Sequence, residues 1–194
     1  MLDVEVIDDP AAAVSALDPI RGRLLAELTE PASAAALATR VGISRQKVNY
    51  HLRALEEHRL VAEAGERRWG GLRERLLVAT AASYVVSPGA MGPVAADPGR
   101  TNDRLSASYL IALAARAVRE VGELWAVARE KNKRLATLSI DTAVHFRSPS
   151  DRAEFTRELS NAITSLVARY HDVSDPQARG YRLLVAAYPA PKED

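Results

Sequence analysis

The sequence predicts an α+β protein made of two groups of elements. Apolar residues recur at helical spacing in several stretches, and other stretches alternate with the period of two that strands show. A loop at 87–102 contains three prolines and three glycines and separates the groups. We therefore predict an N-terminal domain over residues 12–86, a linker loop over 87–102 and a second domain over 103–190.

Three helices are expected in the first domain, because each has a recognisable start or stop. The first begins with Asp18 as N-cap and Pro19 at the first helical position, and Pro31 ends it. Gly42 supplies the positive φ of a tight turn between the second and third helices. The N-caps of these two helices are Ser33 and Ser44, and the third runs to about His58.

A β-hairpin is expected directly after the third helix. The stretches 60–63 and 75–79 are typical of strands, and Gly70 and Gly71 between them mark the hairpin tip. A further strand is expected at 82–86. The order helix, helix, turn, helix and hairpin is that of a winged helix-turn-helix.

The third helix separates a packing face from a polar face. Val48, Leu52 and Leu55 fall within about 40° of one direction and anchor the helix. The remaining side chains suit DNA, because Gln and Asn can pair with adenine, Arg with guanine, and a helix N-terminus with phosphate. The candidate DNA-contacting residues of this helix are Ser44, Arg45, Gln46, Lys47, Asn49, Tyr50, His51 and Arg53.

The hairpin adds a second basic feature in the position of a wing. Such a wing would contact backbone phosphates or the minor groove beside the helix. Either feature alone is compatible with an ordinary solvated surface, but the two together in this order favour DNA binding. The candidate wing residues are Arg67, Arg68, Trp69 and Arg73.

The segment from Pro19 to Val78 resembles the winged helix domain of ArsR-type bacterial transcriptional regulators. The resemblance rests on 35-AALATRVGISRQKVNYHLRALEEHRLV-61. It implies a homodimer that binds operator DNA and is released or rearranged by a small effector. By position, it implies that Ser44, Arg45, Gln46, Asn49, Tyr50 and His51 face DNA.

Two departures from that family pattern have consequences. Arg59 stands where the family usually has glycine after the recognition helix, so a left-handed backbone there would be strained. The chain has no cysteine, and the segment 103–131 has no histidine, which disfavours the metal sites of some family members. We predict no metal and no cofactor.

The charge distribution is uneven although the net charge is only +1. The first thirty residues are acidic, whereas 45–75 is rich in arginine, and a polyanion responds to such local charge. No apolar run is long enough to span a membrane, and the acidic N-terminus is unlike a signal peptide. We therefore expect a cytoplasmic protein without a membrane partner.

The second domain is expected to begin with a long helix from Asp103 to Lys131. Its apolar seam alternates spacings of four and three, as coiled-coil helices do, so we predict a homodimer. The alternative is a monomer in which the helix packs on its own strands. The predicted dimerisation residues are Leu110, Ala114, Ala117, Val121, Leu124, Trp125 and Ala128.

The remainder is expected to be a strand-helix-strand module, with strands at 135–147 and 181–188 around a helix to about Tyr170. It suits a pocket for an unidentified small-molecule effector or a dimer contact. Asp141 and His145 share a strand face, but no nucleophile or oxyanion group accompanies them, so we do not expect an enzyme.

The sequence as a whole predicts a dimeric regulator, most simply a repressor, that binds a palindromic operator in double-stranded DNA. The alternative is a winged helix that binds protein or RNA without reading a DNA sequence.

Overall fold

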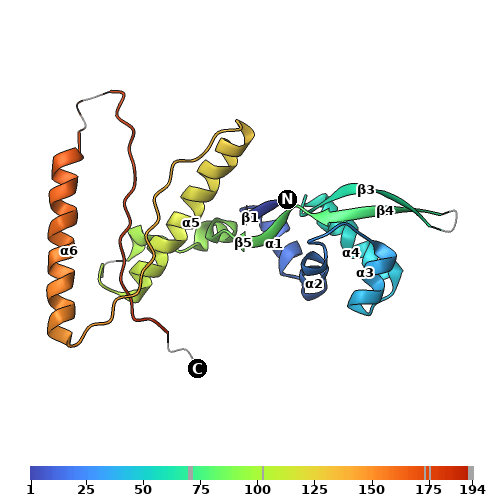
Figure 1. Ribbon diagram of the computed structural model, residues 1–194, viewed down its shortest axis with the longest axis horizontal. Helices are drawn as coiled ribbons and strands as arrows, with labels where there is room; N and C mark the ends of the chain where they lie inside the picture. The colour runs from blue at the N-terminus through green and yellow to red at the C-terminus, as the bar shows by residue number, and fades with distance from the viewer. Residues whose placement is uncertain (70–71, 102, 173, 175, 192–194) are drawn as a thin grey trace. The chain divides into compact units, whose positions relative to one another are not determined.

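A computed structural model describes residues 1–69, 72–101, 103–172, 174 and 176–191. The chain divides into two compact units, Met1–Leu135 and Ala136–Asp194. The mixed α and β class that the sequence predicts is confirmed (Figure 1).

The first unit carries most of the regular structure. Its strand β1 and helix α1 were not expected from the sequence. In chain order its elements are β1 (Leu2–Ile7), α1 (Pro10–Leu17), α2 (Pro19–Glu27), β2 (Ala32–Ser33), α3 (Ala34–Val41), α4 (Arg45–Glu57), β3 (Val61–Trp69), β4 (Leu72–Ala79), β5 (Ala81–Val86), the 3-10 helices η1 (Pro88–Val94) and η2 (Pro98–Arg100), and α5 (Ala107–Glu130).

The predicted helix starts are confirmed in atomic detail. The Asp18 carboxylate accepts hydrogen bonds from the backbone N–H groups of Ile20 and Arg21, at 2.9 and 3.0 Å. Ser33 and Ser44 cap α3 and α4 in the same way. Gly42 has a φ of 74°, which lets the chain turn sharply between these two helices.

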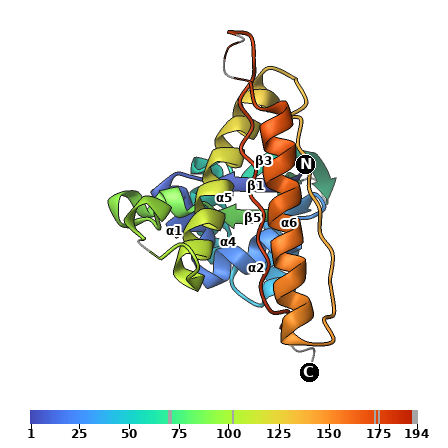
Figure 2. The same ribbon diagram turned by 90° about the vertical axis from the view of Figure 1, so that its left-hand side faces the viewer.

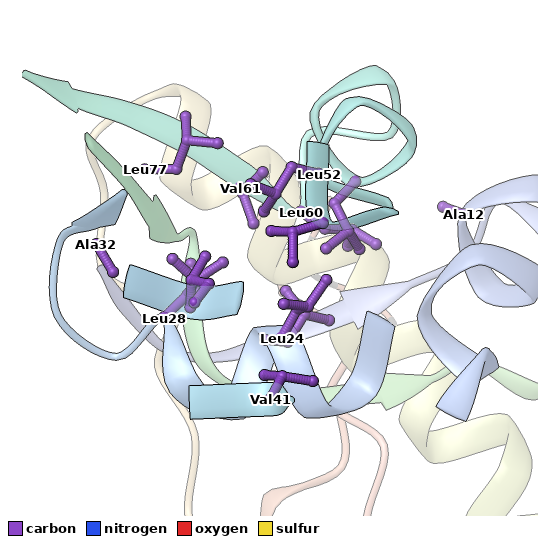
Figure 3. Close-up of a cluster of buried hydrophobic side chains, with 14 of the residues drawn as sticks. Ala12, Leu24, Leu28, Ala32, Val41, Leu52, Leu60, Val61 and Leu77 are labelled. Carbon is purple, nitrogen blue, oxygen red and sulfur yellow. The ribbon is translucent and has the colours of Figure 1, made fainter. Parts of the chain in front are cut away.

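The core of the first unit joins α2, α3, α4 and the hairpin. Leu24, Leu28, Leu37, Val48 and Leu55 are completely buried in it. Figure 3 shows Leu24, Leu28, Leu52 and Leu60 converging between the helices and the strands. Burial of one such side chain contributes roughly 1.5–3 kcal/mol, so this cluster fixes how α4 is presented.

Two small sheets extend from this core. β3 and β4 form an antiparallel hairpin, and β2 pairs with the outer side of β4. The hairpin projects beyond α3 and α4 (Figure 1). The predicted tip at Gly70 and Gly71 lies outside the described residues. β1 and β5 form a separate parallel pair, which confirms the further strand expected at 82–86.

The end of α4 confirms the left-handed conformation considered for Arg59, whose φ is 58°. The N–H of Leu60 donates to the carbonyl of Leu55, and the N–H of Arg59 donates to that of Glu56, both at 2.9 Å. These two bonds define a Schellman motif, in which glycine is the preferred residue at the position of Arg59.

Replacing Arg59 with glycine should therefore stabilise the protein. We expect Arg59→Gly to raise the free energy of unfolding by about 1 kcal/mol and the melting temperature by roughly 2–4 °C. Asn132, with a φ of 49°, provides the control, since asparagine tolerates this conformation and Asn132→Gly should gain less. A lower melting temperature for Arg59→Gly would contradict the assignment.

Helix α5 packs on its own unit through small residues. Ala112, Ala115 and Gly122 are its buried residues, and a Cβ atom at Gly122 would lie only 2.9 Å from a methyl of Val6 in β1. The Arg129 guanidinium also pairs with Glu5, at 2.7 Å. The compact units therefore divide after Leu135 and not at the boundary expected over 87–102, because α5 docks on β1 by close approach.

The second unit contains one helix within the described residues, α6 (Pro149–Tyr170), a single long rod (Figure 1 and Figure 2). Ser148 caps it, because its hydroxyl accepts a hydrogen bond from the N–H of Asp151 at 3.1 Å. The strands expected at 135–147 and 181–188 are not formed: neither stretch, each fully described, contains a strand, and both run as extended chain (Figure 1). The apolar face of α6 is not buried either, and Tyr170 is 75% exposed. Period-two alternation needs a neighbouring strand to become a sheet, and the described residues of this chain do not provide one.

Candidate nucleic-acid interface

Helix α4 presents its polar face to solvent as its apolar spacing predicts. Val48, Leu52 and Leu55 are buried, whereas Gln46 and Asn49 are exposed. Tyr50 is 68% exposed, a large fraction for an aromatic side chain of a helix that is packed on its other side. The polar face of α4, which could enter the major groove of DNA, is thus free of contacts with the protein core.

A groove of about 300 Å³ lies between this face and the hairpin. It brings together side chains from three segments far apart in the sequence. The arginines among them are the predicted candidates Arg45, Arg53 and Arg73, together with Arg75. The full lining is Ser33, Ala34, Arg45, Asn49, Leu52, Arg53, Glu56, Arg73, Glu74, Arg75 and Leu77.

The hairpin concentrates positive charge near its tip. Strand pairing places Arg68 directly opposite Arg73, and like charges in such cross-strand pairs destabilise a hairpin. Arg67 and Arg73 are partly neutralised by Glu74 and Glu66, at 3.4 and 3.5 Å. The backbone of Trp69 pairs with Leu72, but its side chain lies outside the described residues. A polyanion between the two strands would relieve the Arg68–Arg73 repulsion.

Arg75 is a residue of this region that sequence analysis overlooked. Its guanidinium donates to Glu56 of α4 at 2.7 Å and to Glu63 of β3 at 2.9 Å. The hydrogen bond to Glu56 is the largest cause that raises the pKa of Arg75 above its ordinary value. Arg75 therefore ties α4 to the hairpin. Arg75 reaches Glu56 and Glu63 only because of the strand register of the hairpin, which the sequence does not reveal.

The predicted residues do not all lie on the groove side. His51 is half-buried and lies on the other flank of α4. It is close enough to Asp18 for the charge of His51 to make a minor contribution to the lowered pKa of the Asp18 carboxyl. The N–H of Arg21 is the main cause of that lowered pKa. The ring of His51 also meets Tyr50 edge to face, at 5.3 Å between centroids. This places His51 closer to the α2 N-terminus than to the wing.

Removing the Arg68 side chain should weaken DNA binding without changing sequence preference. If Arg68 binds a phosphate, Arg68→Ala should lower the slope of log K against log salt by roughly 0.9 for each phosphate that is no longer neutralised. Binding titrations at several salt concentrations measure this slope. Arg104→Ala, at an exposed arginine outside α4 and the hairpin, is the control and should leave the slope unchanged. An unchanged slope for Arg68→Ala would exclude this residue from the interface.

The predicted seam of α5 lies opposite the face that packs on β1. Its seven residues are all described and none is buried, and Val121 and Leu124 are 47% and 56% exposed. The buried residues Ala112, Ala115 and Gly122 point the other way around the helix. The helix thus has one face for its own unit and a second, apolar face that stays accessible.

Other kinds of site find little support in the described part of the chain. It contains no cluster of three or more histidine, aspartate or glutamate side chains able to hold a metal. Asp141 and His145 are exposed along an extended segment. None of the described helices is both long enough and apolar enough to cross a membrane.

Comparison with known protein families agrees with the observed fold. Residues 16–64 match the family described as "Helix-turn-helix domain". No curated protein matches the chain. Among solved structures, NolR from Sinorhizobium fredii is similar over 64% of this chain and 84% of that one, with 17% identity and a TM-score of 0.31.

The family match and the fold together show that the chain contains a helix-turn-helix domain. Within this chain the matched region runs from the end of α1 to the start of β3, so it includes α4 and most of the residues that line the groove.

Proposed function

We propose that the chain is a homodimeric, sequence-specific transcriptional repressor of the ArsR type, which binds an inverted repeat in double-stranded DNA. The observation that carries the proposal is the groove where the exposed face of α4 meets the arginines of the hairpin. Gln46 and Asn49 would read base edges, and Arg45 and Arg68 would hold phosphates. The effector implied by the family resemblance remains a prediction.

Dimerisation is supported by the accessible apolar seam of α5. A single reading helix contacts too few base pairs for a usable operator, and a two-fold dimer doubles the contacts. The seam is intact after α5 has docked on its own unit, since docking uses the small residues on the opposite face. The monomeric alternative, with the seam covered by the chain's own strands, is less consistent with an exposed Val121 and Leu124.

Selection of bound duplexes from a random DNA pool tests the proposal. We expect enrichment of an inverted repeat with half-sites about one helical turn, or a multiple of it, apart. No enrichment, with or without added cell extract to supply an effector, would contradict the proposal. Binding to duplex DNA without sequence preference would instead favour a general nucleic-acid or protein-interaction module.

A further inference from the structure

The segment 138–147 has the features of a strand that lacks its neighbour. Leu138, Ile140, Val144 and Phe146 occupy even-numbered positions, which share one side when a chain is extended. Leu138 and Ile140 are 85% and 83% exposed. Within the described residues, no backbone hydrogen bond engages the stretch 136–147. An exposed, extended, alternating segment is a template for pairing with another strand.

We propose that a second copy of this chain supplies that neighbour, by antiparallel pairing of residues 139–147 of the two copies around a two-fold axis at Ala143. The chain's own extended segment 181–188 is also described, and it forms no strand with 138–147. Self-pairing around a two-fold axis forms an isologous interface, to which both copies contribute the same surface, as in most homodimers.

Charge selects the register of this pairing. The apolar residues of the segment are even-numbered, so only registers that pair even-numbered residues of the two copies place the apolar residues on the same face of the strand pair. Centring on Ala143 places each Asp141 opposite His145 of the other copy, and Ile140 opposite Phe146. Centring on Asp141 would oppose two carboxylates, which destabilises a strand pair.

The neighbouring registers are less favourable. Centring on Thr142 leaves Asp141 opposite an alanine. Centring on Val144 places Asp141 opposite Arg147, but the guanidinium of Arg147 already donates to Asp151, at 2.9 Å. The register at Ala143 also leaves Phe146 in place, where its ring contacts Phe155 of α6 at 5.3 Å between centroids.

This inference rests on the dimer of the proposed function. Stable interfaces bury about 800 Å² per partner, more than a nine-residue strand pair provides. Association through α5 makes the pairing of 139–147 intramolecular, and the high effective concentration then favours it. The strand pair in turn adds backbone hydrogen bonds that the α5 seam lacks.

Cysteine substitution tests the register directly, because the natural sequence contains no cysteine. Directly opposed residues have Cα atoms about 4.5–5.5 Å apart, within disulfide range. The full-length Ala143→Cys variant should therefore form a disulfide-linked dimer under mild oxidation. In the matched control Ser139→Cys, also at an exposed position, the two thiols would lie roughly 27 Å apart, so it should stay uncrosslinked.

Sedimentation of the reduced proteins separates the two ways in which the test can fail. A dimer that crosslinks at 143 and not at 139 supports the pairing. A dimer that crosslinks at neither position, or equally at both, overturns the pairing and leaves the dimer of the proposed function standing. A monomer without crosslinks would overturn both.

Discussion

Replacing Gln46 and Asn49 together with alanine should abolish sequence preference while leaving general affinity for DNA. Each bidentate contact to a base contributes about 1–3 kcal/mol of discrimination, and a two-fold complex makes each contact twice. We expect the ratio of specific to nonspecific affinity to fall by about 100-fold or more. The measurement is a pair of binding titrations, on the selected duplex and on a scrambled duplex, at the same salt concentration.

Loss of folding cannot account for such a result. Both side chains are exposed, and alanine is the better helix former at both positions, so the double variant should melt no lower than the natural protein. Binding to the scrambled duplex at low salt serves as the internal control. A variant that retains the specificity ratio would exclude α4 as the reading helix.

A charge in the seam of α5 should separate the dimer. Val121→Asp would place a carboxylate from each chain in an apolar interface, and an uncompensated buried charge costs several kcal/mol. We expect the dimer dissociation constant to rise by about 100-fold or more, and operator affinity to fall with it. Sedimentation equilibrium of the variant measures the first quantity.

The same helix offers a matched control. Val127 is 47% exposed, as Val121 is, but it lies about 120° around the helix from it. Val127→Asp introduces the same charge at the same exposure outside the predicted seam, so its dissociation constant should stay near that of the natural protein. Equal effects of the two substitutions would argue against the seam.

The sequence was most informative where signals are local. The caps at Asp18, Ser33 and Ser44 and the turn at Gly42 depend on neighbouring residues, and the structure confirms all of them. The packing phase of α4 follows from helix geometry alone and is confirmed as well. A left-handed Arg59 could be anticipated because the family that the sequence resembles usually has glycine at this position, and its φ is 58°.

Features that depend on long-range contacts could not be predicted. In β1, Leu2, Val4 and Val6 alternate with Asp3 and Glu5, but the strand forms only by pairing with β5, about eighty residues later in the chain. The role of Arg75 depends on the hairpin register, and the docking of α5 depends on the fit of Gly122 against Val6. The stretches 135–147 and 181–188 carry strand periodicity, but periodicity does not state whether the partner lies in the same chain.

Sequence-specific binding is tested most directly by the ratio of two dissociation constants for the natural protein, one for the duplex enriched by selection and one for a scrambled duplex of the same length and composition. At one near-physiological salt concentration, we predict that the enriched duplex binds about 1,000-fold more tightly or better. Equal dissociation constants for the two duplexes would contradict sequence-specific recognition by this protein.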